Sequence, residues 1–93
     1  MTIELKKEDI LEISPTFRFQ WEEMQNCYVV LYPEGMVKLS QSAGEIMKRI
    51  DGNKSIIDMI DDISTAFNGA DVEKDVLKFL EVAYGNGWIR IKQ

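Results

Sequence analysis

Few of the side chains that commonly perform catalysis occur in this chain of 93 residues. The sequence contains no His, which excludes catalytic sets built on His, such as Ser-His-Asp and Cys-His. Cys27 is the single cysteine, so it is interpreted as a small apolar strand residue and not as a nucleophile. No spacing favours a carboxylate pair for acid–base chemistry. The residue types therefore favour binding over catalysis, and no metal or other cofactor is expected.

Asp58, Asp61 and Asp62 lie within one predicted helix turn and are the strongest candidates for holding a hard cation. Asp58 also suits the first turn of a helix, where the partial positive charge of the helix end stabilises a carboxylate. No further ligand converges on the three residues in the sequence. A solvated helix face is therefore the preferred interpretation.

The charge balance argues against nucleic acid as a partner. Sixteen acidic residues against eleven basic ones give a net charge of −5, whereas phosphate binding depends on clustered Lys and Arg. The aromatic residues Phe17, Phe19 and Trp21 could stack on bases, but they alternate with polar neighbours, as core residues of a half-buried strand do. The last predicted helix is mainly acidic, which suits a DNA major groove poorly.

The chain is predicted to form one domain, residues 16–93, preceded by an N-terminal arm, residues 1–15, which ends at Pro15. The arm is expected to pack on the domain, to exchange between subunits or to stay mobile; a monomer and a dimer are both consistent with it. The first residues lack the apolar run of a signal peptide, and no segment has the length of a membrane span. A reducing cytoplasm is therefore the expected compartment.

Three strands are predicted first. Residues 17–22 alternate between apolar and polar side chains, which is typical of a half-buried strand. Residues 27–32 are apolar on both faces, and a turn through Pro33 and Gly35 leads to a short strand over residues 36–39. Gly35 is also suited to a left-handed conformation in a bulged loop. The three strands should form an antiparallel meander.

Three amphipathic helices follow. The first is capped by Ser42, which has capping-box spacing to Glu45, or by Ser40, and the second and third begin at Ser55 and Asp71. Glycines near residues 52, 69 and 87 end them. Residues 88–92 alternate again and form either a short terminal strand or an extended tail. The fold class is α+β, a winged helix-turn-helix-like domain with a three-stranded antiparallel sheet followed by a three-helix bundle.

The short strand over residues 36–39 is the feature with the clearest binding chemistry. If it lies at a sheet edge, its unpaired N–H and C=O groups can hydrogen-bond to another chain. The alternative is an ordinary edge strand that is kept short and so avoids aggregation. The physics of the segment leaves both interpretations open.

The sequence resembles the pyrroloquinoline quinone biosynthesis protein D (PqqD) family over residues 17–89. One departure is Ser40, where the family usually has Asn, and both residues cap helices. The matching segments occur in the family's order: Phe17-Arg18-Phe19-Gln20-Trp21-Glu22, Val30-Leu31-Tyr32-Pro33-Glu34-Gly35, Leu39-Ser40-x-Ser42-Ala43-x-Glu45-Ile46, Asp51-Gly52, Asp75-Val76-x-x-Phe79-Leu80 and Gly87-Trp88-Ile89.

The resemblance implies a non-catalytic peptide chaperone. Family members bind the precursor peptide PqqA and present it to the radical S-adenosylmethionine enzyme PqqE, which joins a Glu and a Tyr side chain on the way to the cofactor pyrroloquinoline quinone. The same fold recurs as a leader-peptide recognition domain (RiPP recognition element). In such domains the peptide adds beside the third strand and lies in a groove against the third helix.

Carried to this chain, the resemblance implies two sets of site residues. The peptide-binding set is Met36, Val37, Lys38, Leu39, Asp75, Val76, Phe79 and Leu80. Val76 and Leu80 are also on the predicted core stripe, so for them core packing is at least as well supported as peptide contact. The second set is assigned to the sheet core and to an enzyme-docking face: Arg18, Gln20, Trp21 and Glu22.

Two alternative functions stay open at this point. One is a winged-helix nucleic-acid-binding domain, which rests on the order of the helices alone, and fold order does not determine function. The other is an interaction subunit that binds only the enzyme and never the peptide.

Overall fold

The computed structural model of the protein describes residues 5–92, so residues 1–4 of the predicted arm lie outside the described part. Eight elements follow one another within these residues. They are β1 (Leu11–Ile13), β2 (Arg18–Glu22), β3 (Cys27–Tyr32), β4 (Gly35–Lys38), α1 (Gln41–Met47), α2 (Ile56–Ala66), α3 (Glu73–Gly85) and β5 (Ile89–Ile91).

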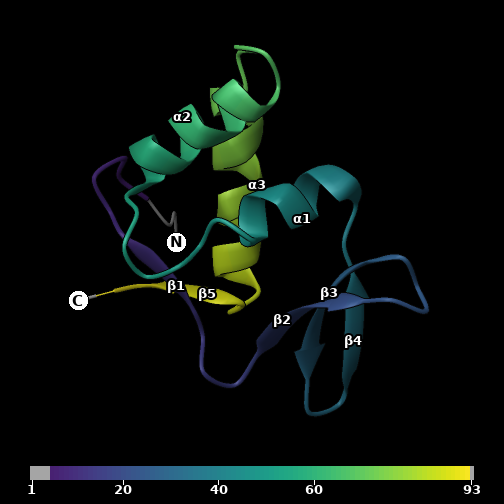
Figure 1. Cartoon of the computed structure of the whole chain (residues 1–93). Helices are drawn as coiled ribbons and strands as arrows, with labels where there is room; N and C mark the ends of the chain where they lie inside the picture. Colours follow the sequence, from purple (N-terminus) through teal and green to yellow (C-terminus); the bar gives the residue numbers. More distant parts are fainter. Residues whose placement is uncertain (1–4, 93) are drawn as a thin grey trace.

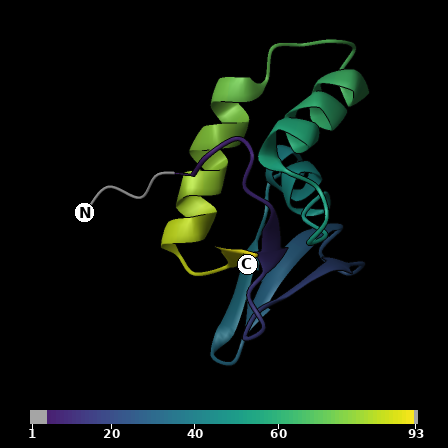
Figure 2. The same cartoon turned by 90° about the vertical axis from the view of Figure 1, so that its left-hand side faces the viewer.

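The architecture is the predicted α+β arrangement, with helices toward one end of the molecule and strands toward the other (Figure 1). Strands β2, β3 and β4 form an antiparallel sheet in the order β2-β3-β4, which confirms the predicted meander. The view from the side shows α2 and α3 standing above this sheet (Figure 2). Within residues 5–92, no helix combines the length and the apolar character that crossing a membrane would require.

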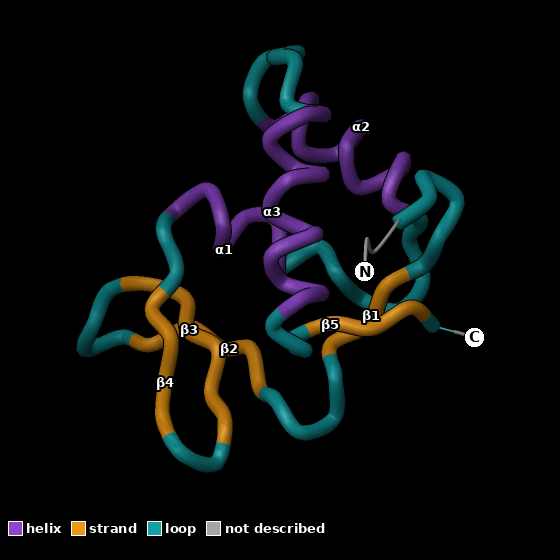
Figure 3. Tube along the Cα trace, turned by 180° about the vertical axis from the view of Figure 1, so that it is seen from behind, coloured by secondary structure: helices purple, strands orange, loops and turns teal. Residues whose placement is uncertain are grey.

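The described part of the predicted arm packs on the rest of the chain. Strand β1 pairs antiparallel with the terminal strand β5, with Leu11 opposite Ile91, and the two lie apart from the three-stranded sheet (Figure 3). The backbone carbonyls of Asp9 and Lys7 accept hydrogen bonds from the N–H groups of Ile56 and Ile57. These N–H groups belong to the first turn of α2, where a helix has no internal acceptors. The N-terminal segment thus supplies backbone partners to α2 as well as a strand to β5.

The helix starts agree with two of the predicted caps and correct two others. The hydroxyl of Ser40, not that of Ser42, accepts a hydrogen bond from the N–H of Ala43 at 3.2 Å, so α1 begins two residues earlier than the capping-box spacing indicates. Ser55 caps α2 through the N–H of Asp58, as predicted. The prediction that α3 starts at Asp71 is wrong, because α3 begins at Glu73 without a side-chain cap.

The turn between β3 and β4 also differs from one expectation. Tyr32 and Gly35 pair across a two-residue turn, and Gly35 is absent from the glycines with positive φ. A bulged, left-handed conformation at Gly35 is therefore not used. Glycine supplies left-handed positions elsewhere, at Gly52, Gly69 and Gly87, and Gly87, with a φ of +78°, turns the chain from the end of α3 into β5.

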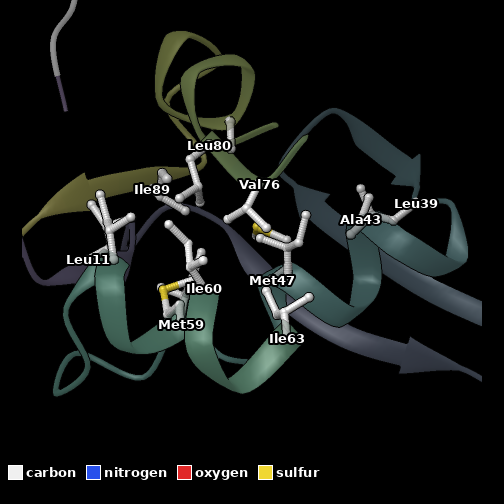
Figure 4. Close-up of a cluster of buried hydrophobic side chains, with 14 of the residues drawn as sticks. Leu11, Leu39, Ala43, Met47, Met59, Ile60, Ile63, Val76, Leu80 and Ile89 are labelled. Carbon is white, nitrogen blue, oxygen red and sulfur yellow. The ribbon is translucent and has the colours of Figure 1, made fainter. Parts of the chain in front are cut away.

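The core is a single apolar cluster at the junction of the three helices and the strands (Figure 4). Side chains from α1, α2 and α3 point toward one another there, and Leu11 and Ile89 add the β1–β5 pair to the same cluster. The fully buried members with the largest side chains are Leu11, Met47, Ile56, Met59, Leu80, Val30 and Val76.

Helix α1 approaches the sheet closely at one position. A Cβ atom added to Gly44 would lie 2.8 Å from Cδ2 and 3.3 Å from Cβ of Tyr28 in β3. A contact that close to the root of a ring side chain cannot be relieved by a small rotation of its tip. Gly44 therefore sets the distance between α1 and the sheet.

Replacing Leu11 by Ala is expected to lower the free energy of unfolding by about 2–5 kcal/mol, the usual cost of removing a fully buried Leu side chain. Urea denaturation followed by circular dichroism measures this change. Met24→Ala is the control, because Met24 is 92% exposed and its loss should change stability by less than about 0.5 kcal/mol. Equal stabilities of the two variants would show that the N-terminal strand is not part of the core.

Gly44→Ala is expected to destabilise the protein by about 1–3 kcal/mol, because overpacking against Tyr28 outweighs the roughly 1 kcal/mol that Ala gains over Gly in a helix. Gly85→Ala in α3 is the matched control. Nothing lies within 4 Å of a Cβ atom at Gly85, so this variant should be as stable as the parent or slightly more stable. Thermal melting of both variants checks the opposite signs.

Candidate peptide-binding site

Strand β4 lies at the edge of its sheet. In the order β2-β3-β4 it pairs with β3 on one side, and no strand of residues 5–92 pairs with its other side. The segment that the sequence singled out as a conditional edge strand is therefore an edge strand in the structure. It spans Gly35–Lys38, one residue earlier than the predicted range of 36–39.

The pairing register shows which backbone groups of β4 point outward. The N–H of Leu39 donates to the carbonyl of Tyr28 at 3.0 Å, and the same register pairs Val37 with Val30. In an antiparallel pair, every second residue exchanges hydrogen bonds with its partner, and the residues between point their N–H and C=O groups away. The N–H and C=O groups of Val37 and Leu39 thus point toward β3. Met36 and Lys38 direct their N–H and C=O groups to the free edge.

Side chains of β4 alternate between the two faces of the sheet. Val37 is half-buried and packs against the core on the helix side, together with the buried Leu39 that follows the strand. Met36, 40% exposed, and Lys38 lie on the opposite face. Of the four strand residues in the predicted peptide-binding set, Met36 and Lys38 therefore supply free backbone groups, while Val37 and Leu39 anchor the strand.

A groove of about 330 Å³ lies between the helices and begins where β4 ends. Ser40, which follows Leu39 directly, lines it together with Ala43 and Ile46 of α1. Most of the remaining wall is formed by Ile63 of α2, by Phe67 at the end of α2, and by Asp75, Val76 and Phe79 of α3. The groove is largely apolar, and Asp75 is its one carboxylate.

The structure separates the four predicted α3 residues into two groups. Asp75 is exposed, Phe79 is half-buried, and both line the groove. Val76 reaches the groove wall but is only 1% exposed, and Leu80 is fully buried and does not line the groove. Leu80 thus belongs to the core, and Val76 serves mainly as packing beneath the groove surface.

Of the ten residues that line the groove, the predicted peptide-binding set contained only Asp75, Val76 and Phe79, and Phe67 and Val72 are among the seven that it missed. Phe67, which is 42% exposed, was placed on the apolar stripe of α2, and Val72 on that of α3. A stripe shows that a residue faces apolar neighbours, but it does not show that the neighbours leave a gap. The sequence signal that could have identified Phe67 as a groove residue is its position: it is a large aromatic residue at the end of the stripe, just before the Asn68-Gly69 helix end.

The predicted enzyme-docking residues do not share one surface. Trp21 lies on the helix side of the sheet, where its ring meets that of Tyr28 edge-on at a centroid distance of 5.0 Å. Arg18, Gln20 and Glu22 alternate with it and therefore lie on the opposite face. A partner that touches all four residues would have to contact both sides of β2.

One member of the acidic cluster on α2, Asp62, forms a surface ion pair. The carboxylate of Asp62 accepts a hydrogen bond from the ammonium group of Lys54, and this contact raises the pKa of Lys54. Within residues 5–92, no group of three or more His, Cys, Asp or Glu side chains is arranged to hold a metal ion.

Comparisons with known proteins agree on one family. The family model of coenzyme PQQ synthesis protein D (PqqD) matches residues 27–89. A PqqA binding protein of Methylococcus capsulatus is 42% identical over 86 residues, which are 92% of each chain. A PqqA binding protein of Azotobacter vinelandii is 49% identical over 84 residues, which cover 89% of this chain and 91% of the relative.

A solved structure supports the fold. The solution NMR structure of the PqqD truncation of Methylobacterium extorquens PqqCD is described as a functional and stand-alone RiPP recognition element. It matches with a TM-score of 0.77 and 19% identity, over 94% of this chain and 95% of the solved chain. The sequence relatives and the shared fold together show that the chain belongs to the PqqD family, as the resemblance of its motifs indicates.

Proposed function

We propose that this protein is a peptide chaperone of pyrroloquinoline quinone biosynthesis, which binds the precursor peptide PqqA by strand addition to β4. The observation that carries the proposal is the free edge of β4, where Met36 and Lys38 direct their N–H and C=O groups outward. The relatives at 42% and 49% identity are PqqA binding proteins, which supports PqqA as the peptide.

In this arrangement main-chain pairing contributes affinity, whereas side-chain contacts contribute selectivity. Backbone hydrogen bonds to Met36 and Lys38 make few demands on peptide sequence, because every residue except Pro offers the same N–H and C=O groups. Selectivity then comes from alternate side chains of the peptide. Those on the helix side meet the groove beyond Ser40, with Phe79 and Phe67 as apolar contacts and Asp75 as the charged one.

The chaperone presents the bound peptide to the radical S-adenosylmethionine enzyme PqqE and performs no chemistry itself. Strand addition needs neither a catalytic side chain nor a cofactor in this chain. The docking surface for the enzyme involves β2, with Arg18, Gln20 and Glu22 on the outer sheet face and Trp21 on the helix side. The protein acts in the cytoplasm, which suits an unpaired Cys27.

Titration of ¹⁵N-labelled protein with PqqA is expected to shift the backbone amide signals of residues 36–39 and of the groove side of α3. The amide signal of Gly85, at the far end of α3, serves as an internal reference. Shifts confined to β1, β5 and the first turn of α2 would place the peptide elsewhere and refute strand addition at β4.

Lys38→Pro is expected to weaken PqqA binding roughly two- to tenfold, the range of one lost hydrogen bond, because Pro has no backbone N–H. The fold should persist, since the N–H of Lys38 points away from β3 and Pro is tolerated at such edge positions. Isothermal titration calorimetry measures the change.

Lys38→Ala is the matched control for this experiment. It removes the same charge and side chain as the Pro variant but keeps the backbone donor. If both variants bind PqqA with the same affinity, the backbone of residue 38 does not pair with the peptide.

A further inference from the structure

The groove between the three helices has one ionisable lining residue. Seven of its ten lining residues are apolar, two are serines and one is Asp75. All three helices contribute to the apolar wall, as the positions of Ala43, Ile63 and Val76 show (Figure 4). None of the lining residues is Lys or Arg. A peptide that lies in this groove therefore meets a single negative charge on an otherwise apolar surface.

The carboxylate of Asp75 has no partner within the described part of the chain. Five ion pairs occur among residues 5–92, and neither they nor the side-chain hydrogen bonds of α3 include Asp75. Lys78 follows Asp75 by almost one helix turn, but the two side chains do not form an ion pair. Asp75 is exposed, so water solvates this carboxylate until a peptide covers the groove.

Positive charges near Asp75 do not cancel its carboxylate. Asp75 lies in the first turn of α3, and a helix start has a partial positive charge of roughly half a unit. Glu73 in the same turn and Asp71 just before it share this interaction. The nearest lysines on α3, Lys74 and Lys78, do not line the groove. The charge of Asp75 is therefore the main electrostatic feature that a peptide in the groove encounters.

The spacing of two groove residues along α3 matches an extended peptide. Asp75 and Phe79 are four residues apart, so their Cβ atoms lie one helix turn apart, at about 5–6 Å. In an extended chain, side chains two residues apart point to the same face and are separated by roughly 6.6 Å. An extended peptide along α3 can thus place one side chain against Phe79 and the next side chain of the same face against Asp75.

We propose that the groove selects peptides in which an apolar residue and a Lys or Arg residue are two positions apart. The apolar side chain packs against Phe79 and Phe67, and the cationic group pairs with the carboxylate of Asp75. The methylene groups of the Lys or Arg side chain cover the apolar wall beside it. The net charge of −5 also attracts a positively charged segment toward the protein.

The inference rests on the proposed function, because it concerns the same peptide at the same site. It adds the chemical class of the side chains that the groove accepts. The backbone pairing at β4 does not depend on it, since those hydrogen bonds make few demands on the peptide sequence.

Asp75→Asn tests the charge with little change in the shape of the side chain. PqqA is expected to bind this variant roughly three- to tenfold more weakly than the parent, and the difference should shrink at high salt, which screens the ion pair. Isothermal titration calorimetry at low and high NaCl concentration measures both effects. Asp71→Asn is the matched control, because it removes the same charge from a residue that neither lines the groove nor caps α3.

An exchange of charges identifies the peptide residue that pairs with Asp75. Each Lys and Arg of PqqA is replaced in turn by Glu, and each variant peptide is titrated into the Asp75→Lys protein. One of these replacements is expected to strengthen binding to Asp75→Lys at least about fivefold over unmodified PqqA. An apolar residue is expected two positions from that site, and its replacement by Ala should weaken binding to the parent protein.

The outcomes separate this inference from the proposed function. If PqqA does not bind the parent protein, both fail. If PqqA binds and shifts the amide signals of Met36 and Lys38, but Asp75→Asn binds it as tightly as Asp71→Asn does, only the inference is overturned. The same holds if no replacement in PqqA restores binding to Asp75→Lys. Should Asp75→Lys fail to fold in a thermal melt, the comparison of the two Asn variants decides.

Discussion

The short length of β4 decides how the sheet meets the helices. After a two-residue turn the strand has only the four residues Gly35–Lys38, and Ser40 already caps α1. Because the helix begins this soon after the strand, its first turn lies at the rim of the sheet. Ser40 then lines both the groove toward α3 and a second cavity that is also lined by Trp21 of β2 and Tyr28 of β3. A longer strand would move α1 away from this rim, and neither cavity would keep its present walls.

Free backbone groups at an edge strand would ordinarily be a liability, because they invite pairing with other copies of the chain. In β4 the outward groups belong to only two residues, one of which is the charged Lys38. The same four-residue length that limits uncontrolled pairing also limits how many backbone bonds a guest peptide can form. Affinity must therefore come partly from side chains, and the neighbouring groove supplies an apolar surface for them.

Helix α3, which forms the far wall of that groove, is held in position by contacts outside the groove. Helix α3 continues through Gly87 into β5, and β5 pairs with β1 from the opposite end of the chain. The residues before β1 in turn supply acceptors to the first turn of α2, and Ile10 pairs with Ser55, its cap. The N-terminal segment thus contacts both α2 and the strand that follows α3, and so fixes the two helices relative to each other. The groove lies between α1 and these two helices. Removing the segment would affect the binding surface without touching any residue that lines it.

Local patterns in the sequence determined most of the secondary structure. Alternation over residues 17–22, the apolar run over 27–32 and the helical stripes depend on neighbours two to four positions apart, so most element bounds could be predicted to within one or two residues. The end of the first helix is an exception, because α1 stops at Met47 and not near the predicted Gly52. They also identified β4 as a short strand, and family motifs located Asp75 and Phe79 on the helix beside the groove. The start of α3 was wrong because Asp71 has the right chemistry for a cap but makes no capping bond.

Other features were decided only by the tertiary structure, because they depend on contacts between residues far apart in the chain. The pairing of β1 with β5 joins residues separated by almost the whole sequence, and no local pattern distinguishes it from a mobile arm. The direction of the Met36 and Lys38 backbone groups follows from the register with β3, since a shift by one residue would turn them inward. The cavities beside Phe67 and Trp21 exist because neighbouring elements do not cover these side chains completely. Hydrophobic patterning in the sequence indicates which residues are buried, but it does not indicate where gaps remain between packed surfaces.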